Sequence, residues 1–273
     1  MADFSSYLIA TDLDGTLLGP DGRIPERNRK ALARFQAGGG LFTVSTGRVH
    51  LNIRVAIGDP LCLLNAPCVM SNGAYLYDFQ QGTPLAEERM AESDVKELVA
   101  VIQQSYPDAQ FRVSTPDALR VERTDGYLQR DLPRYDAGAV QVSPIGEWPT
   151  HDWYKIVFRA DAETIRDMRR ALQAHFGERF SYTASGSSFL EVQAPGVNKA
   201  AGLAKLRRLF GRDRILIACG DYENDLEMLR AADIAVCPAN AMDEVKRIAH
   251  HTLCHCKDGL MGDIVDRLER GEL

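Results

Sequence analysis

The stretch YLIATDLDGTL, residues 7–17, decides the fold of this chain. It begins with an apolar run typical of a buried strand and ends in two aspartates, Asp12 and Asp14, separated by one residue. A strand that carries two carboxylates at its carboxyl end can hold a divalent cation and offer one carboxylate as a nucleophile. Taken alone, the pattern fits a turn with an Asp cap equally well, so segments elsewhere must decide between the two interpretations.

Strands alternate with helices in the first and last parts of the chain. In the first part we expect strands over 7–12, 41–45 and 68–71, a helix over 25–37 and a hairpin return over 74–78. After residue 196 we expect helices over 199–210, 226–232, 242–250 and 260–270, with strands over 214–219 and 234–237. Such alternation predicts an α/β fold, a doubly wound, Rossmann-like parallel sheet with helices on both faces.

The middle of the chain has a different pattern. We expect helices over 93–105 and 162–176, and short strands over 110–114, 119–123, 153–159, 180–184 and 188–192. Neighbouring strands of this kind pair as hairpins, which indicates a smaller α+β unit inserted into the first. The predicted division is a core of residues 1–80 and 196–273 and an inserted domain of residues 81–195.

Composition limits the possible partners and locations. The 273 residues are 45% hydrophobic and 26% charged with a net charge of −6, and no basic run of five or more occurs, which argues against nucleic-acid or anionic-membrane partners. No apolar stretch approaches the roughly 18–20 residues that a membrane span needs. The first residues lack the pattern of a signal peptide, so we expect a cytoplasmic protein.

One segment, HHTLCHC at 250–256, is rich in zinc-binding residue types. On a strand, however, Cys254 and Cys256 share one face while His255 points to the other. The zinc spacings that carry weight pair one such motif with a distant second, and the sequence has none. We therefore interpret this segment as structural and expect all six cysteines to be reduced.

Polar side chains suited to a phosphate and a metal follow four expected strands or turns. They are Asp12 with Asp14, residues 44–48 (VSTGR), Lys199 at the start of a helix, and residues 220–225 (GDYEND). Ligands bind at the carboxyl ends of the strands of an open α/β sheet. A hydroxyl with backbone N–H groups cradles phosphate oxygens, and an ammonium at a helix start favours an anion. Each segment alone has an ordinary structural explanation, but together they indicate phosphoryl transfer.

Together these segments resemble the motifs of the haloacid dehalogenase-like (HAD) superfamily of phosphatases. DLDGT at 12–16, Thr46, Lys199 and GDYEND at 220–225 resemble its four motifs in order. TGR at 46–48, SNG at 71–73, GVNK at 196–199 and PANAMDEVK at 238–246 narrow the resemblance to the Cof-type, sugar-phosphatase-like branch, type IIB. The resemblance covers nearly the whole chain and implies that the insertion is a C2B-type cap domain.

The resemblance also implies a role for each matched residue. Asp12 would be the nucleophile and a Mg²⁺ ligand, Asp14 the general acid/base and a metal ligand through its backbone carbonyl, and Asp221 the third ligand. The phosphate would be held by the backbone of Leu13 and by Thr46, Gly47, Lys199 and Asn224. Asp225 would orient Lys199 or a metal-bound water, with Arg48 and Asn72 in supporting positions.

We therefore expect a Mg²⁺-dependent phosphatase that hydrolyses a small phosphomonoester, a sugar phosphate first, through an aspartyl-phosphate. Flavin and pyridoxal phosphates stay open as substrates, and we expect a monomer or weak homodimer. A phosphomutase or phosphotransferase of the same fold would use the same residues. A non-enzymatic sensor of a phosphate ligand is the other alternative, although binding alone needs no nucleophile.

The inserted domain is expected to contact the leaving group. The expected contacts lie over 189–191 and around Tyr127 or Arg130. Glu191 has two interpretations, a hydrogen bond to sugar hydroxyls or a solvated strand position. Packing in a core or at a hinge is favoured for Trp148 and Trp153 over stacking on a ring.

Overall fold

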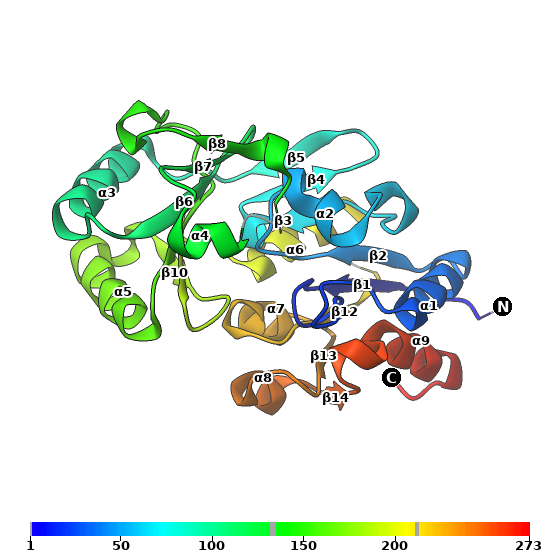
Figure 1. Ribbon diagram of the computed structural model, residues 1–273. Helices are drawn as coiled ribbons and strands as arrows, with labels where there is room; N and C mark the ends of the chain where they lie inside the picture. The colour runs from blue at the N-terminus through cyan, green and yellow to red at the C-terminus, as the bar shows by residue number, and fades with distance from the viewer. Residues whose placement is uncertain (1, 132–134, 211–212) are drawn as a thin grey trace.

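The computed structural model describes residues 2–131, 135–210 and 213–273. Its first layer is a five-stranded, all-parallel sheet in the order β14-β13-β12-β1-β2 (Figure 1). The strands are β1 (Tyr7–Thr11), β2 (Leu41–Val44), β12 (Ile215–Cys219), β13 (Ile234–Pro238) and β14 (His251–Leu253). The strand that ends in the two aspartates is paired on both sides, as its continuous apolar run indicates.

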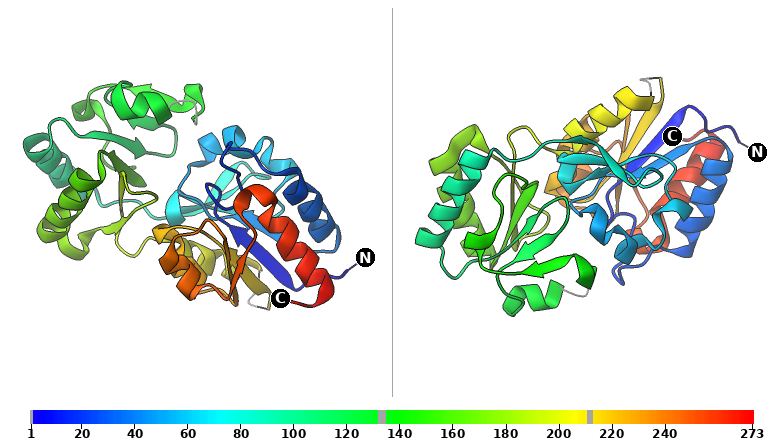
Figure 2. Two further views of the ribbon diagram at one scale, coloured as in Figure 1. Left: turned by 60° about the horizontal axis from the view of Figure 1, so that its bottom comes forward. Right: turned by 90° about the horizontal axis from the view of Figure 1, so that it is seen from above.

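Helices cover both faces of this sheet (Figures 1 and 2). They are α1 (Glu26–Ala37), α6 (Lys199–Phe210), α7 (Leu226–Arg230), α8 (Asp243–Ile248) and α9 (Leu260–Arg270). Alternation along β1 separates two cores: Ile9 packs in the cluster that includes residues of α1 and α9, whereas Leu8 packs in the cluster of α6 and α7. The predicted doubly wound α/β fold is confirmed.

A three-stranded antiparallel sheet follows β2. It consists of β3 (Cys68–Met70), β4 (Tyr75–Asp78) and β5 (Thr83–Glu87), preceded by the short helix α2 (Ile53–Ile57). The predicted hairpin of β3 and β4 is present, and β5 extends it beyond the pattern that the sequence showed. We therefore propose to count residues 83–87 with the first segment when the chain is divided.

The inserted domain is a six-stranded sheet with two long helices on one face (Figure 1). Its strands are β6 (Gln110–Ser114), β7 (Leu119–Val121), β8 (Val140–Val142), β9 (Lys155–Arg159), β10 (Ser181–Thr183) and β11 (Phe189–Gln193). Its helices are α3 (Glu92–Ser105), α4 (Gly126–Asp131) and α5 (Ala162–Phe176). Trp148 and Trp153 are buried in its core, as expected.

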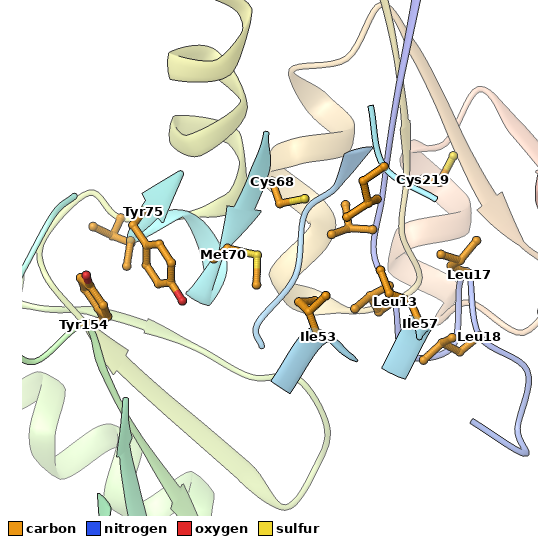
Figure 3. Close-up of a cluster of buried hydrophobic side chains, with 14 of the residues drawn as sticks. Leu13, Leu17, Leu18, Ile53, Ile57, Cys68, Met70, Tyr75, Tyr154 and Cys219 are labelled. Carbon is orange, nitrogen blue, oxygen red and sulfur yellow. The ribbon is translucent and has the colours of Figure 1, made fainter. Parts of the chain in front are cut away.

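Alternation gives the inserted sheet two unlike faces. Ile156, Phe158, Leu190 and Val192 belong to the hydrophobic core with residues of α3 and α5. Their neighbours along β9 and β11 point the other way, toward the first domain. The hydrophobic cluster in Figure 3 extends from Leu13 through Met70 to Tyr75 of β4. The Tyr75 ring stacks on the ring of Tyr154 in the inserted domain, with 4.5 Å between the ring centroids. The insertion thus packs on the core as a cap.

The segment 250–256 corrects one predicted element. The helix expected over 242–250 ends at Ile248, and the chain then forms the edge strand β14. His250 Nδ1 accepts the Ala235 N–H (3.0 Å) and His255 Nδ1 accepts the Lys257 N–H (3.2 Å), so both rings have structural roles. All six cysteines are free thiols. Among the described helices, none is long and apolar enough to cross a membrane.

Candidate active site

The sheet register brings three of the predicted segments to one edge. Thr11, the last residue of β1, pairs with Cys219 of β12 on one side and Val44 of β2 on the other. The residues that follow all three strands therefore meet at the carboxyl edge. They line a cavity of about 160 Å³ beneath the cap that includes Asp12, Asp14 and Asp221.

Lys199 lies at the floor of this site, fully buried at the start of α6. Its Nζ donates to Asp12 Oδ1 at 2.5 Å and to Asp225 Oδ1 at 2.6 Å. Burial opposes its charge, but these two carboxylates outweigh burial and raise the pKa of Lys199. The ammonium is therefore fixed beside the predicted nucleophile.

Asp225 is held by both of its oxygens. Its Oδ2 accepts the backbone N–H groups of Asp221 (2.9 Å) and Tyr222 (3.2 Å), while Oδ1 accepts from Lys199. Gly220 has to be glycine, because a Cβ there would lie 2.4 Å from Asp225 Cβ. Of the two roles expected for Asp225, the contacts favour orienting Lys199.

The carboxylates form a group that suits a hard cation. Asp12, Asp221 and Asp225 each offer an oxygen within 4.8 Å of the others. Burial raises the pKa of Asp12 well above its usual range, and burial and Asp225 raise the pKa of Asp221 to about 7. Since Asp225 already has its partners, Asp12 and Asp221 are the better ligands. Clustered carboxylate oxygens fit Mg²⁺, which prefers oxygen ligands and whose charge would favour the ionised form of both groups.

The glycine and threonine after Asp14 support Asp221. Thr16 Oγ1 donates to Asp221 Oδ1 at 2.7 Å, and Asn240 Nδ2 donates to the Gly15 carbonyl at 2.8 Å. Gly15 has φ +85°, and a Cβ there would lie 2.4 Å from Asp221 Oδ2. Only glycine admits both the left-handed backbone and the close approach.

Asp14 is paired with Arg48 across the mouth of the cavity. Arg48 Nε and Nη2 donate to its two carboxylate oxygens at 2.9 and 2.7 Å. This bidentate pair is partly exposed on the Asp14 side. Arg48 thus positions the residue expected to be the acid/base catalyst.

The predicted phosphate-binding residues lie around the same floor. Thr46 is buried, and its Oγ1 accepts the Arg48 N–H at 3.2 Å. Gly47 and Asn224 line the cavity, and Asn224 Nδ2 donates to Asn72 Oδ1 at 3.3 Å. Asn72 has left-handed backbone angles (φ +54°) and turns its amide toward the cap. The backbone of Leu13 lies between the two aspartates, as the sequence requires.

Glu191 is not a solvated strand residue, and that interpretation was wrong. It is 1% exposed, and its Oε2 accepts from Lys155 Nζ (2.7 Å) and Asn72 Nδ2 (2.5 Å), while Ser185 Oγ donates to Oε1. Burial raises the pKa of Glu191, but Lys155 and Ser185 outweigh it and the pKa falls below its usual value. A buried carboxylate on the cap face is stable here because a buried lysine lies beside it.

Other cap residues line the same cavity as Asp12. Phe189 lines the cavity as expected, together with Arg112, Asp131 and Tyr135. The Arg112 guanidinium lies 5.2 Å from the Tyr135 ring centroid and 6.0 Å from that of Phe189. Tyr127 and Arg130, which we expected to face the leaving group, are not among the described residues that line this cavity.

The sequence did not reveal every residue of this site. Thr16 belongs to the first motif, but the pattern gave it no role. Lys155 is the one charge in the apolar run WYKIVF, residues 153–158, and this isolation was a usable signal of a buried charge. Arg112 and Asp131 carry no such signal, because their approach to the cavity depends on how the cap packs.

Comparisons with known proteins agree with this geometry. The family model described as haloacid dehalogenase-like hydrolase matches residues 9–261. A 5-amino-6-(5-phospho-D-ribitylamino)uracil phosphatase of Bacillus subtilis (strain 168) is 31% identical over 250 residues, 90% of this chain and 91% of that protein. An HMP-PP phosphatase of Escherichia coli O157:H7 is 28% identical over 261 residues, 92% and 91% of the two chains.

Solved structures show the same fold. A protein from Streptococcus mutans UA159 has a TM-score of 0.84 at 23% identity, covering 96% of this chain and 98% of that one. A haloacid dehalogenase-like hydrolase from B. subtilis has a TM-score of 0.82 at 21% identity, with 96% and 99% covered. The resemblance drawn from the sequence is confirmed, and so is the expected enzyme class, a phosphoric monoester hydrolase.

Proposed function

Because this chain belongs to the haloacid dehalogenase-like hydrolases, we propose that it is a Mg²⁺-dependent phosphatase of small phosphomonoesters that uses Asp12 as its nucleophile. One observation carries the proposal: the Asp12 carboxylate lies in a cavity between two domains with a buried lysine 2.5 Å from it. Phosphoryl transfer needs positioning and neutralised charge more than covalent help. Asp12 and Lys199 supply both.

In the first half of the reaction, an Asp12 carboxylate oxygen attacks phosphorus. The bond between phosphorus and the ester oxygen breaks, and the Asp14 carboxyl group gives its proton to the leaving oxygen, which departs as an alcohol. Lys199, held by Asp225, neutralises charge on the phosphoryl oxygens. The Thr46 hydroxyl and the neighbouring backbone orient the phosphate.

In the second half, the Asp14 carboxylate takes a proton from water as the water oxygen attacks phosphorus. The bond to Asp12 breaks, which restores its carboxylate and releases inorganic phosphate. A carboxyl group that donates a proton does not keep two hydrogen bonds from a guanidinium. We propose that Asp14 turns from Arg48 toward the substrate when it is protonated.

The residues present fit a bound Mg²⁺. The carboxylates of Asp12 and Asp221 and the backbone carbonyl of Asp14 would hold it, and Thr16 would orient Asp221. When bound, Mg²⁺ supplies positive charge to the phosphoryl oxygens. Asp12 and Asp221 then have a reason to be ionised although they are crowded and buried.

The cap wall supports a substrate whose leaving alcohol carries a planar ring. Flat surfaces for stacking are offered by the rings of Phe189 and Tyr135 and by the guanidinium of Arg112, which lies between them. The buried Asp131 offers a hydrogen-bond acceptor. The names of two relatives refer to a ribitylaminouracil phosphate and to HMP-PP. We rank ring-bearing phosphates above plain sugar phosphates, which were the first expectation.

The test is phosphate release from a panel of esters, with Mg²⁺ and with EDTA. The panel contains hexose and pentose phosphates, flavin mononucleotide, pyridoxal phosphate, 5-amino-6-(5-phospho-D-ribitylamino)uracil and glycerol phosphate. Mg²⁺-dependent release from ring-bearing esters is expected. Failure of the folded protein to release phosphate from any of them would contradict the proposal. A cytoplasmic location and a monomeric or weakly dimeric state stay predictions.

A further inference from the structure

We propose that Lys155, a residue of the cap, is a positioning residue of the phosphate site. Its ammonium fixes the peptide that joins Gly47 to Arg48 and thereby orients the Thr46 hydroxyl. This inference rests on the proposed function, since it concerns the same phosphate. In this proposal the cap has a second role besides contacting the leaving group, because one of its side chains completes the phosphate-binding loop of the core.

The contacts of Lys155 reach from one domain into the other. Lys155 Nζ donates to Glu191 Oε2 within the cap and to the Gly47 carbonyl of the core, both at 2.7 Å. The side chain is 1% exposed. A charge buried so fully is costly unless it is paired and hydrogen-bonded, and here Glu191 supplies the opposite charge while the Gly47 carbonyl accepts a second hydrogen bond.

Gly47 itself is enclosed from two sides. A Cβ built on it would lie 3.1 Å from Asn72 Oδ1 and 3.3 Å from Lys155 Nζ. Asn72 Nδ2 in turn donates to Glu191 Oε2 at 2.5 Å. The loop, the cap lysine and the cap glutamate therefore form one closed set of contacts.

The peptide plane carries the effect of Lys155 to the phosphate site. In a trans peptide the C=O and N–H groups point in opposite directions. The Gly47 carbonyl points to Lys155, and the N–H of the same peptide belongs to Arg48 and donates to Thr46 Oγ1 at 3.2 Å. We therefore infer that Lys155 fixes the orientation of the Thr46 hydroxyl. Through the Arg48 backbone it also helps to fix the position of Asp14, which pairs with the Arg48 side chain.

Glu191 keeps the lysine in place. Residues 155 and 191 lie on the neighbouring strands β9 and β11, where Lys155 pairs with Gln193 and Glu191 with Val157. Gln193 Nε2 also donates to the Ser71 carbonyl at 2.6 Å. The polar face of these two strands thus holds both loops of the core, 45–48 and 71–73.

The experiment compares Lys155→Met, the double variant Lys155→Met/Glu191→Gln and the control Lys96→Met, an exposed cap lysine. The double variant leaves no unpaired buried charge, so its melting temperature should be close to that of the wild type even if the single variant is unstable. We measure inorganic phosphate binding with Mg²⁺ by calorimetry, and KM and kcat over the ester panel.

Loss of one charge-assisted hydrogen bond predicts phosphate binding weaker by about 10- to 100-fold in both Lys155 variants. The loss in kcat/KM should be the same for every ester, because the phosphate is common to all of them. The Lys96 variant should match the wild type. A merely structural role of Lys155 would not produce a uniform loss in a double variant of normal stability.

Two results would overturn the proposal. One is a stable double variant that binds phosphate as tightly as the wild type. The other is a loss that differs between esters, which would make Lys155 a residue that recognises the leaving group. If the wild type binds phosphate but hydrolyses no ester, the proposed function is refuted. The calorimetry then still tests whether Lys155 contributes to phosphate binding. A wild type that does neither would refute both.

Discussion

Two lysines in the described part of the chain are fully buried, one in each domain, and their surroundings differ. Lys199 of the core contacts two carboxylates, Asp12 and Asp225, beside further acids. Lys155 of the cap contacts one carboxylate and one backbone carbonyl. Burial lowers the pKa of Lys155, against the opposing effect of Glu191, whereas the carboxylates around Lys199 raise its pKa.

The difference shows how one residue type serves two purposes. Lys199 touches the proposed nucleophile, so its charge acts on the group that reacts. The described contacts of Lys155 are with Glu191 and with the loop behind the proposed phosphate site, so we infer that its charge fixes geometry. We therefore expect changes around Lys199 to act mainly on kcat and changes at Lys155 to act mainly on phosphate affinity.

The largest effect is expected at the carboxylate that Lys199 faces. Asp12→Asn removes the nucleophile while keeping the shape of the side chain, so kcat should fall on the order of 10⁴-fold or more. Steady-state phosphate release measures this, with circular dichroism to show that the fold is intact. Turnover near that of the wild type would rule out Asp12 as nucleophile.

Lys199→Met comes next and gives the direct contrast with Lys155→Met. Removing a cation from the transition state should lower kcat by about 10²- to 10³-fold. Single-turnover rates at saturating substrate separate this loss from a loss of affinity. Equal kcat values for the two lysine variants would contradict the proposal that Lys199 acts on the reaction rate and Lys155 on phosphate affinity.

The proposed metal ligands Asp12 and Asp221 lie on the Lys199 side of the site. Asp221→Asn should raise the Mg²⁺ concentration needed for half-maximal activity by at least about tenfold, because a ligand loses its charge. Lys155→Met should leave the Mg²⁺ requirement unchanged. Magnesium titrations of both variants test this, and an unaltered titration for Asp221→Asn would refute its role as a ligand.

Phe189 lies on the same cap strand as Glu191 and lines the cavity, where we expect it to contact the leaving group. Phe189→Ala should lower kcat/KM for ring-bearing esters by about three- to tenfold, from lost stacking, and leave glycerol phosphate little affected. Lys155→Met should lower both classes equally. A uniform loss in Phe189→Ala would show that the ring does not select the substrate.

The smallest effect concerns stability and pH in the absence of metal. The pKa of Asp221 is raised to about 7 in the folded state. Between the ordinary pKa of an Asp side chain and pH 7, the folded protein therefore holds a proton on Asp221 that the unfolded protein has lost, which stabilises the folded state. In EDTA the protein should therefore melt higher at pH 5.5 than at pH 8, by roughly 2–4 °C. Differential scanning calorimetry measures this.

Asp221→Asn is the matched control for that shift, because it keeps the side chain's shape without a titrating group. Its melting temperature in EDTA should change less with pH over the same range. If the variant and the wild type respond equally, other groups carry the pH dependence.

The core could be predicted further than the cap. The apolar runs and helix patterns around Asp12 predicted its parallel sheet, and the motif at 220–225 predicted where Asp221 lies. Edge strand β14 was missed because His251–Leu253 is short and polar at its start, and a strand of three residues leaves little periodicity. Of the cap contacts expected around Tyr127 or Arg130, the neighbouring residues Asp131 and Tyr135 line the cavity, and their contact with the leaving group stays a prediction.

The sequence by itself determined the fold class, the family and the residues at the strand ends, because strand periodicity and short motifs are local properties of the chain. Only the tertiary structure decided that Glu191 is paired with Lys155, that Arg48 holds Asp14, and that a cap lysine reaches the Gly47 carbonyl. These contacts join residues 34 to 108 positions apart. Their existence depends on how the two domains and their strands pack, and no local pattern in the chain records that packing.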